Sequence, residues 1–247
     1  MTKPAVLFIA FCCLVSAQNK PVTTTARALP PAEAKAAPAE AKAKSETLHF
    51  TVNWPSGLSL GEGDLISSLT DEGWSFSFKV DAAVPAFAVT ESAKSKGTQD
   101  LCSTELVKDG RRGERKIDEK TTFDAAKLTA TRKTGGGGGQ SEMRINACAK
   151  DALTFIQYVR KELVAGRIPP AQSVYYGSAY QTRLQYTGTQ KMRSGDEFVD
   201  ADRLTATIRS SSKEMTVDLF FARDATRTPL LVQIPVAVGK FSVEFVR

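Results

Sequence analysis

The chain has 247 residues, of which 42% are hydrophobic and 24% are charged, and its formal net charge is +6. This composition excludes a collagen, a coiled coil and a wholly disordered chain, and the length allows one or two domains. His49 is the single histidine of the sequence, which excludes metal sites built from several histidines and leaves one imidazole for acid–base chemistry.

Residues 1–17 predict a signal peptide. Lys3 precedes an apolar run over residues 5–15, and small residues follow it up to Ala17. A basic start, a short apolar stretch and a small-residue cleavage site are typical of secretory signals, with the cut expected between Ala17 and Gln18. The run is shorter than the roughly 20 apolar residues that span a bilayer, and no later segment approaches that length. We expect an exported protein, periplasmic or extracellular, without a transmembrane span in the mature chain. An uncleaved anchor or a buried strand is the alternative.

Residues 18–46 predict a disordered spacer. The segment has few large apolar side chains and repeats a Pro-Ala-Glu-Ala-Lys unit at 31–35 and 38–42. Prolines favour extended backbone whereas the Ala-Glu-Ala-Lys units favour helix, so the spacer should be semi-stiff. The remaining residues, 47–247, are expected to form a single β-rich domain of unknown function.

From residue 48 the hydropathy alternates with period two, which is typical of strands with one buried face. The pattern is clearest over 48–54 and 74–80, and further strands are expected over 87–90, 115–122 and 128–132. Aromatic residues of the 74–80 strand could stack on nucleic-acid bases, but their alternation favours a place in the core.

The segment Gly57–Gly61 matches the G-x-S-x-G motif of serine hydrolases, with Ser59 at the nucleophile position. That chemistry needs a strand-to-helix turn and a histidine later in the chain. Here the surroundings predict a hairpin, and His49 precedes the serine and is expected to face solvent. A hydrolase that uses Ser59 or a carboxylate pair is therefore a minor alternative, and no catalytic residue is assigned.

Cys102 and Cys148 are the two cysteines that follow the signal segment. In an oxidising compartment, two cysteines without metal-ligand spacing predict one disulfide. Two separate buried thiols are the alternative.

Basic and acidic residues interleave along the chain, most clearly over 108–120. A nucleic-acid-binding protein usually concentrates its basic residues on one stripe or helix. A solvated strand face explains the run better, so no nucleic-acid partner is predicted.

Two further patterns predict loops. The run Gly135–Gly139 lacks the Lys-Ser/Thr of a phosphate-binding loop and indicates a flexible connection. Asp196, Glu197, Asp200 and Asp202 do not have the spacing of a calcium-binding EF-hand, and a solvated hairpin explains them, with calcium as the alternative. No metal and no cofactor is therefore predicted.

Residues 149–164 are the one convincing amphipathic helix, with apolar side chains such as Leu153 and Phe155 on one side. Asp151 or Asn146 is expected to cap its start, and Gly166 is expected to follow its end. Alternating segments then resume, and strands are expected over 174–186, 203–209, 215–221, 230–236 and 241–246.

One helix among roughly ten strands predicts a mainly β (α+β) fold. The apolar face of a long antiparallel meander must be covered, and the helix is the only other element available. We expect a strongly curved antiparallel sheet, or incomplete barrel, packed around the helix. A two-sheet sandwich with the helix at one end is the alternative.

Four segments taken in order resemble the landmarks of a bacterial envelope family. They are the hairpin Trp54–Gly63, the pair Phe123-Asp124, the helical segment Asp151–Arg160 and the turn Asp224–Leu230. The ordered set is similar to the family filed as domain of unknown function 3108, and the resemblance covers essentially the whole mature domain. It implies exported proteins with mostly antiparallel β structure, and it transfers no activity or catalytic residue.

These patterns predict an exported, non-enzymatic envelope protein that binds an apolar or amphipathic ligand, such as a lipid. A curved sheet partly closed by one helix leaves an apolar concavity, and barrel mouths are common ligand sites. The residues that would bind the ligand are unknown from the sequence. An assembly or scaffolding module that contacts an envelope protein is the alternative hypothesis.

Overall fold

The computed structural model describes residues 45–84, 87–236 and 239–246. The predicted signal peptide, the expected cut between Ala17 and Gln18 and nearly all of the predicted spacer lie outside these residues. The first strand begins at Ser45, which places the start of β structure slightly ahead of the expected boundary at residue 47.

One continuous 15-stranded sheet forms the body of the protein, in the order β8-β7-β6-β5-β4-β3-β2-β1-β15-β14-β13-β12-β11-β10-β9. Its first half comprises β1 (Ser45–Asn53), β2 (Ser59–Thr70), β3 (Gly73–Val84), β4 (Phe87–Gly97), β5 (Ser103–Arg112), β6 (Arg115–Asp124), β7 (Thr129–Thr134) and β8 (Gln140–Arg144). Its second half comprises β9 (Lys150–Asp151), β10 (Gln172–Tyr175), β11 (Ala179–Ser194), β12 (Glu197–Arg209), β13 (Glu214–Ala222), β14 (Pro229–Val236) and β15 (Gly239–Val246). A single helix, α1 (Ala152–Val164), separates β9 from β10.

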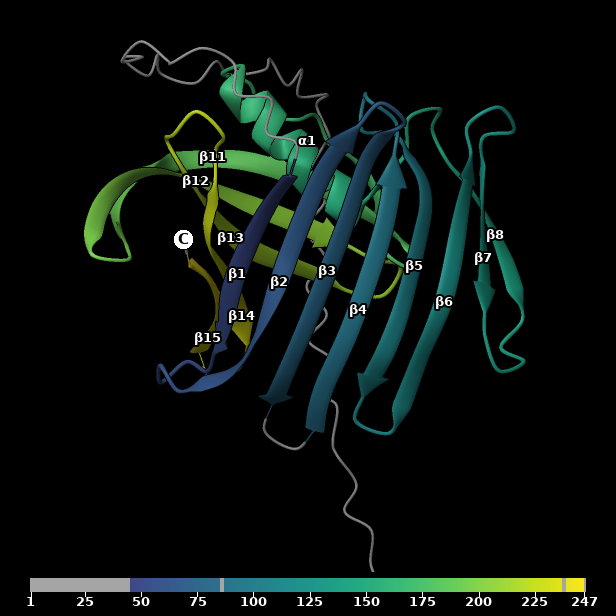
Figure 1. The fold of residues 1–247 in the computed structure, drawn as a ribbon, viewed down its shortest axis with the longest axis horizontal. Helices are drawn as coiled ribbons and strands as arrows, with labels where there is room; N and C mark the ends of the chain where they lie inside the picture. Colours follow the sequence, from purple (N-terminus) through teal and green to yellow (C-terminus); the bar gives the residue numbers. More distant parts are fainter. Residues whose placement is uncertain (1–44, 85–86, 237–238, 247) are drawn as a thin grey trace, which may run out of the picture.

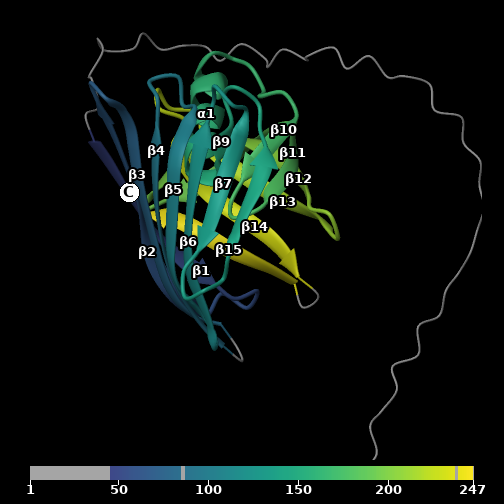
Figure 2. The same ribbon diagram turned by 90° about the vertical axis from the view of Figure 1, so that its right-hand side faces the viewer.

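The sheet curls strongly, so that β11–β15 lie behind β1–β6 with α1 at their upper end (Figures 1 and 2). The first and last strands pair, with Phe50 opposite Phe245. The backbone of Ser103 in β5 also donates a 2.8 Å hydrogen bond to the carbonyl of Ala149, just before β9. The expected mainly β fold, a strongly curved antiparallel sheet around one helix, is therefore confirmed, and the alternative of two separate sheets is not.

Helix α1 contributes side chains to two of the three core clusters. Leu153 packs into a cluster built on β1–β7, which includes Leu48, Phe76 and Leu106. Val159 and Leu163 pack into a second cluster built on β10–β13. Full burial of one such side chain stabilises the fold by roughly 1.5–3 kcal/mol, so the apolar face of α1 joins the two halves of the sheet.

The termini of α1 follow from local chemistry. The Asp151 side chain accepts hydrogen bonds from the backbone N–H groups of Leu153 and Thr154, so Asp151 rather than Asn146 is the N-cap. At the other end Gly166 has φ +70° and donates to the carbonyl of Leu163. This left-handed turn stops the helix where the sequence predicts.

The structure contains more strands than the roughly ten expected. Strand β2 was not among the strand ranges expected from alternation, and Gly63 interrupts the apolar pattern of its sequence. Gly63 faces the Phe50 ring, where a Cβ would lie 2.4 Å from Phe50 Cζ. The single strand expected over 174–186 is split into β10 and β11 by Gly177, whose φ is +80°. Two of the residues expected at the start of the helix form β9 instead, because they pair in parallel with β10.

Candidate functional site

A groove of about 290 Å³ lies between α1, the adjoining ends of β1–β3 and the turn after β13. Its volume lies just below the range that is usual for ligand sites in proteins, roughly 300–1,000 Å³. We call it the rim groove, because its lining residues come from α1 and from the ends of β1–β3, and α1 lies at the upper end of these strands in Figure 1.

The sheet wall of the rim groove consists of Glu46, Ser67 and Trp74. Trp74 is half-buried and stacks on Phe76 with ring centroids 5.7 Å apart. Phe76 is itself a core residue, so the indole is held in place while part of it stays open to the groove. An aromatic ring fixed in this way offers apolar area at little entropic cost.

The helix wall consists of Gln157, Arg160, Lys161 and Val164. Residues three or four apart share one face of a helix, which brings these four side chains to the same side of α1. Val164 is 55% exposed although it is apolar, and it lies opposite a sheet wall that carries Trp74. The groove therefore combines apolar surface with two cations.

Arg160 joins the three parts of the rim groove. Its Nη1 and Nη2 donate to the two carboxylate oxygens of Glu46 at 2.5 and 2.9 Å, and its Nε donates to the carbonyl of Thr226 at 3.0 Å. Nη1 also donates to Gln157 Oε1 at 3.1 Å. These bonds occupy most of the five N–H donors of the guanidinium. Arg160 therefore holds β1 and the turn at Thr226 in place, and few of its donors remain for a ligand.

Two landmark segments of the sequence meet at this bond, the helical segment 151–160 and the turn 224–230. A family model described as "Protein of unknown function (DUF3108)" matches residues 49–246. The chain belongs to this family. The resemblance noted in the sequence is thereby confirmed, and family membership assigns no activity.

A solved structure shares the fold. The crystal structure of a β-barrel-like protein of domain of unknown function DUF1849 from Brucella abortus matches with a TM-score of 0.58 and 8% sequence identity. The match covers 82% of this chain and 95% of that chain. None of the curated proteins matches the chain. In the part of the chain that the structure describes, no helix is long and apolar enough to cross a membrane.

The hydrolase motif does not form a catalytic site. Ser59 is the exposed first residue of β2 and directly follows the turn of the β1–β2 hairpin, so no helix begins there. The side chain of His49 is 69% exposed, and its Nδ1 lies 2.5 Å from Asp64 Oδ1 on the neighbouring strand. Asp64 lies five positions after Ser59 along β2, roughly 17 Å away at 3.4 Å per residue. The imidazole therefore does not reach the serine.

The acidic cluster is only partly the solvated hairpin that the sequence predicts. Asp196, Glu197 and Asp200 are exposed around the β11–β12 turn, but Asp202 is buried. Its Oδ2 accepts a 2.7 Å hydrogen bond from Nη1 of Arg227. Within the described residues no group of three or more His, Cys, Asp or Glu side chains could hold a metal ion.

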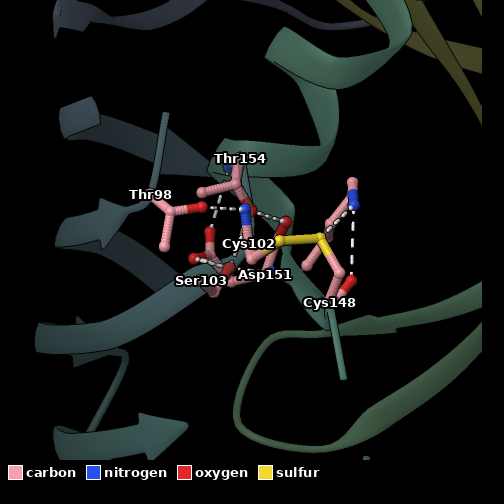
Figure 3. The surroundings of a disulfide bond; sticks show 7 residues. Thr98, Cys102, Ser103, Cys148, Asp151 and Thr154 are labelled. Atoms are coloured by element: carbon pink, nitrogen blue, oxygen red, sulfur yellow. Dashed lines mark hydrogen bonds between the residues drawn. A yellow bond between two sulfur atoms is a disulfide. The ribbon is translucent and has the colours of Figure 1, made fainter. Parts of the chain in front are cut away.

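The structure joins Cys102 and Cys148 by a disulfide, with Cα atoms 4.5 Å apart. Figure 3 shows this bond beside the first turn of α1. Ser103, next to Cys102, donates to Asp151 Oδ2 at 2.7 Å and lies 2.8 Å from Thr154 Oγ1. The disulfide and these hydrogen bonds fix the start of α1 against β5, and so they help to position the helix wall of the groove.

Burial raises the pKa of the Asp151 carboxyl above its ordinary value. Hydrogen bonds from Ser95, Ser103 and the backbone of the first helical turn oppose this effect and only partly offset it. Asp151 is therefore a structural carboxyl whose protonation is coupled to folding.

A second polar cluster lies inside the curved sheet, and sequence reasoning missed it. Lys108 and Glu119 form a buried 3.0 Å ion pair, and the Lys108 Nζ lies 4.4 Å from the centroid of the Tyr176 ring. The Tyr176 hydroxyl donates to Glu91 at 2.5 Å. The expectation that residues 108–120 form a solvated face is wrong for Lys108, because the β10–β11 turn covers this part of the sheet. The cluster links β4–β6 in the first half of the sheet to the β10–β11 turn in the second half.

Proposed function

We propose that this protein is an exported, non-enzymatic binding protein of the bacterial envelope, and that the rim groove binds an apolar or amphipathic ligand. One observation carries the proposal. Half-buried Trp74 and 55%-exposed Val164 both line the groove of about 290 Å³, one on the sheet wall and the other on the helix wall. Apolar surface in a concave site gains free energy when a ligand removes it from water, at about 25 cal/mol per Å².

The expected affinity can be estimated from the number of ligand atoms. A dodecyl amphiphile of about 14 non-hydrogen atoms, at roughly 0.5 kcal/mol per atom, would bind with about −7 kcal/mol. This corresponds to a Kd of about 10 µM. Such a value suits a carrier or sensor that exchanges its ligand.

Export is supported by the disulfide, because disulfides persist in oxidising compartments. The signal-like segment 1–17 is the second support. Expression of the full chain in a bacterium, followed by fractionation and mass measurement of the protein, tests this part. We expect a periplasmic or secreted product that begins at Gln18, and a cytoplasmic product that retains Met1 would contradict it.

Ligand binding can be measured with a reporter already present in the groove. Trp54 and Trp74 are the two tryptophans of the chain, and Trp54 packs edge-on against Phe241 at the far end of β1. A Trp54→Phe variant therefore reports on Trp74 alone. Titration with bromine-labelled dodecyl amphiphiles, below their micelle concentrations, should quench its emission saturably.

Two matched variants locate the binding. Val164→Glu places a charge on the apolar helix wall and should weaken quenching at least tenfold. Leu58→Glu makes the same change at another exposed apolar residue, in the β1–β2 turn, and should leave quenching unchanged. Equal behaviour of the two variants, or absence of saturable quenching with every head group, would contradict the proposed function.

A further inference from the structure

The charges that line the rim groove are unequally satisfied. Glu46 and Arg160 neutralise each other through two hydrogen bonds. Lys161, the next residue of α1, is exposed and has no ion pair among the residues that the structure describes. The neighbouring carboxylate of Glu162 is held by Arg167 through two hydrogen bonds, so the groove presents one cation without a direct ion-pair partner.

The position of Lys161 relates this charge to the apolar surface. Val164 follows one turn later on the same helix face, and Trp74 lies on the opposite wall. A ligand with its head group at Lys161 would thus extend its chain between Val164 and Trp74. One end of the groove favours a charge, and the adjoining surface favours a hydrocarbon.

We propose that the rim groove selects a single-chain amphiphile with an anionic head group, a carboxylate or a phosphate, and that Lys161 binds this head group. The inference rests on the proposed function and adds the chemical class of the ligand. Arg160 is excluded as the head-group residue because its donors already hold Glu46, Gln157 and Thr226. The groove volume of about 290 Å³ accommodates one short acyl chain and not the two chains of a phospholipid.

Lys161 also lies in the last turn of α1, where a cation interacts favourably with the helix dipole. That structural role alone would make the variant less stable without changing which ligand binds best. The ranking of ligands therefore separates the two roles.

The test uses the full-length Trp54→Phe protein and bromine-labelled dodecyl probes that differ only in their head groups. Dodecanoate and dodecyl phosphate should bind five- to tenfold more tightly than dodecyl maltoside, and dodecyltrimethylammonium should bind most weakly. Added salt should reduce these differences, since exposed charges are screened. Comparison of the two anions shows which head group is preferred.

Substitution at Lys161 supplies the decisive readout. Lys161→Gln should bring dodecanoate down to the level of the maltoside, and Lys161→Glu should reverse the order of the anionic and cationic probes. Lys94→Gln is the matched control, because Lys94 is an exposed lysine on β4 outside the groove. It should leave the ranking intact.

The outcomes distinguish this inference from the proposed function. Equal binding of all head groups, or an unchanged ranking in Lys161→Gln, would overturn the assignment of an anion and leave the groove as an apolar site. Saturable quenching of Trp74 by two-chain phosphatidylglycerol vesicles carrying brominated acyl chains would overturn the single-chain limit. Absence of binding by every probe would overturn the proposed function itself.

Discussion

Glu46 near the start of β1 and Arg160 in α1 form a two-bond ion pair although 114 residues separate them in the chain. The Arg160 side chain is 4% exposed and that of Glu46 is 27% exposed. Removing one partner from a buried pair leaves a charge that is neither hydrated nor neutralised. This pair therefore ties the first strand to the helix, and it shapes the rim groove as it does so.

Glu46→Gln should destabilise the protein by about 1–2 kcal/mol, because the buried guanidinium loses its countercharge while Glu46 itself was partly hydrated. Urea unfolding followed by circular dichroism measures the change. Glu214→Gln removes a partner from the exposed Arg209–Glu214 pair and should have little effect. A similar loss in both variants would contradict the structural role of Arg160.

Loss of the disulfide should destabilise the fold more strongly. Cys102 and Cys148 are 46 residues apart, and closing a loop of that length contributes about 4 kcal/mol in the chain-entropy model. Thermal unfolding of the oxidised protein should therefore occur well above that of the Cys102→Ser/Cys148→Ser double variant. The double variant should also show faster amide exchange in the first turn of α1. Reductant should lower the melting temperature of the wild type and leave that of the variant unchanged.

Asp151 predicts a specific pH dependence. Its pKa is raised from the ordinary 3.8, so between that value and the higher folded pKa the native state keeps a proton that the unfolded state has released. Stability contributed by this group therefore falls as pH rises through the window. Asp151→Asn keeps a good N-cap but cannot ionise.

The measurement is the free energy of unfolding of both proteins in urea at several values from about pH 4 to about pH 7. The advantage of the wild type over Asp151→Asn should shrink as pH rises. A difference that stays constant or grows would show that the hydrogen bonds to the carboxylate outweigh its desolvation.

Gly177 in the β10–β11 turn should not tolerate a side chain. Its φ of +80° disfavours other residues, and an added Cβ would lie 2.6 Å from Glu119 Oε2 and 2.9 Å from Lys108 Nζ. Gly177→Ala should therefore cost about 2–3 kcal/mol, from backbone strain and displacement of the buried pair. Gly195→Ala shares a positive φ but has open space, so it should cost about 1 kcal/mol. Equal costs by urea unfolding would argue against the tight contact.

Local chemistry was enough to predict several elements. The alternation of Leu48 and Phe50 with polar neighbours identified β1, and the left-handed turn at Gly166 marks the end of α1 as expected. These features depend on residues a few positions apart, because side-chain direction in a strand and hydrogen bonding at a helix end repeat over short spans. The predicted segment 1–17 and the spacer stay predictions, since they lie outside the described residues.

Features that depend on distant partners were not predictable in this way. Lys108 and Asp202 were expected to be solvated, and both are buried because Tyr176 and Arg227 cover them. A charged residue on an alternating strand has the same sequence pattern whether it faces water or a buried counterion. Burial is decided only when the sheet curls and brings its two halves together.

The sequence by itself determined a mainly β chain with one amphipathic helix and two cysteines in a position to pair. The tertiary structure alone decided where a ligand could bind, because the rim groove takes residues from β1, β2, β3, α1 and the turn at Thr226. Periodicity records which face of an element is buried, not which elements meet. The closing of the sheet around α1 creates the groove, and this packing brings Trp74, Lys161 and Val164 to one site.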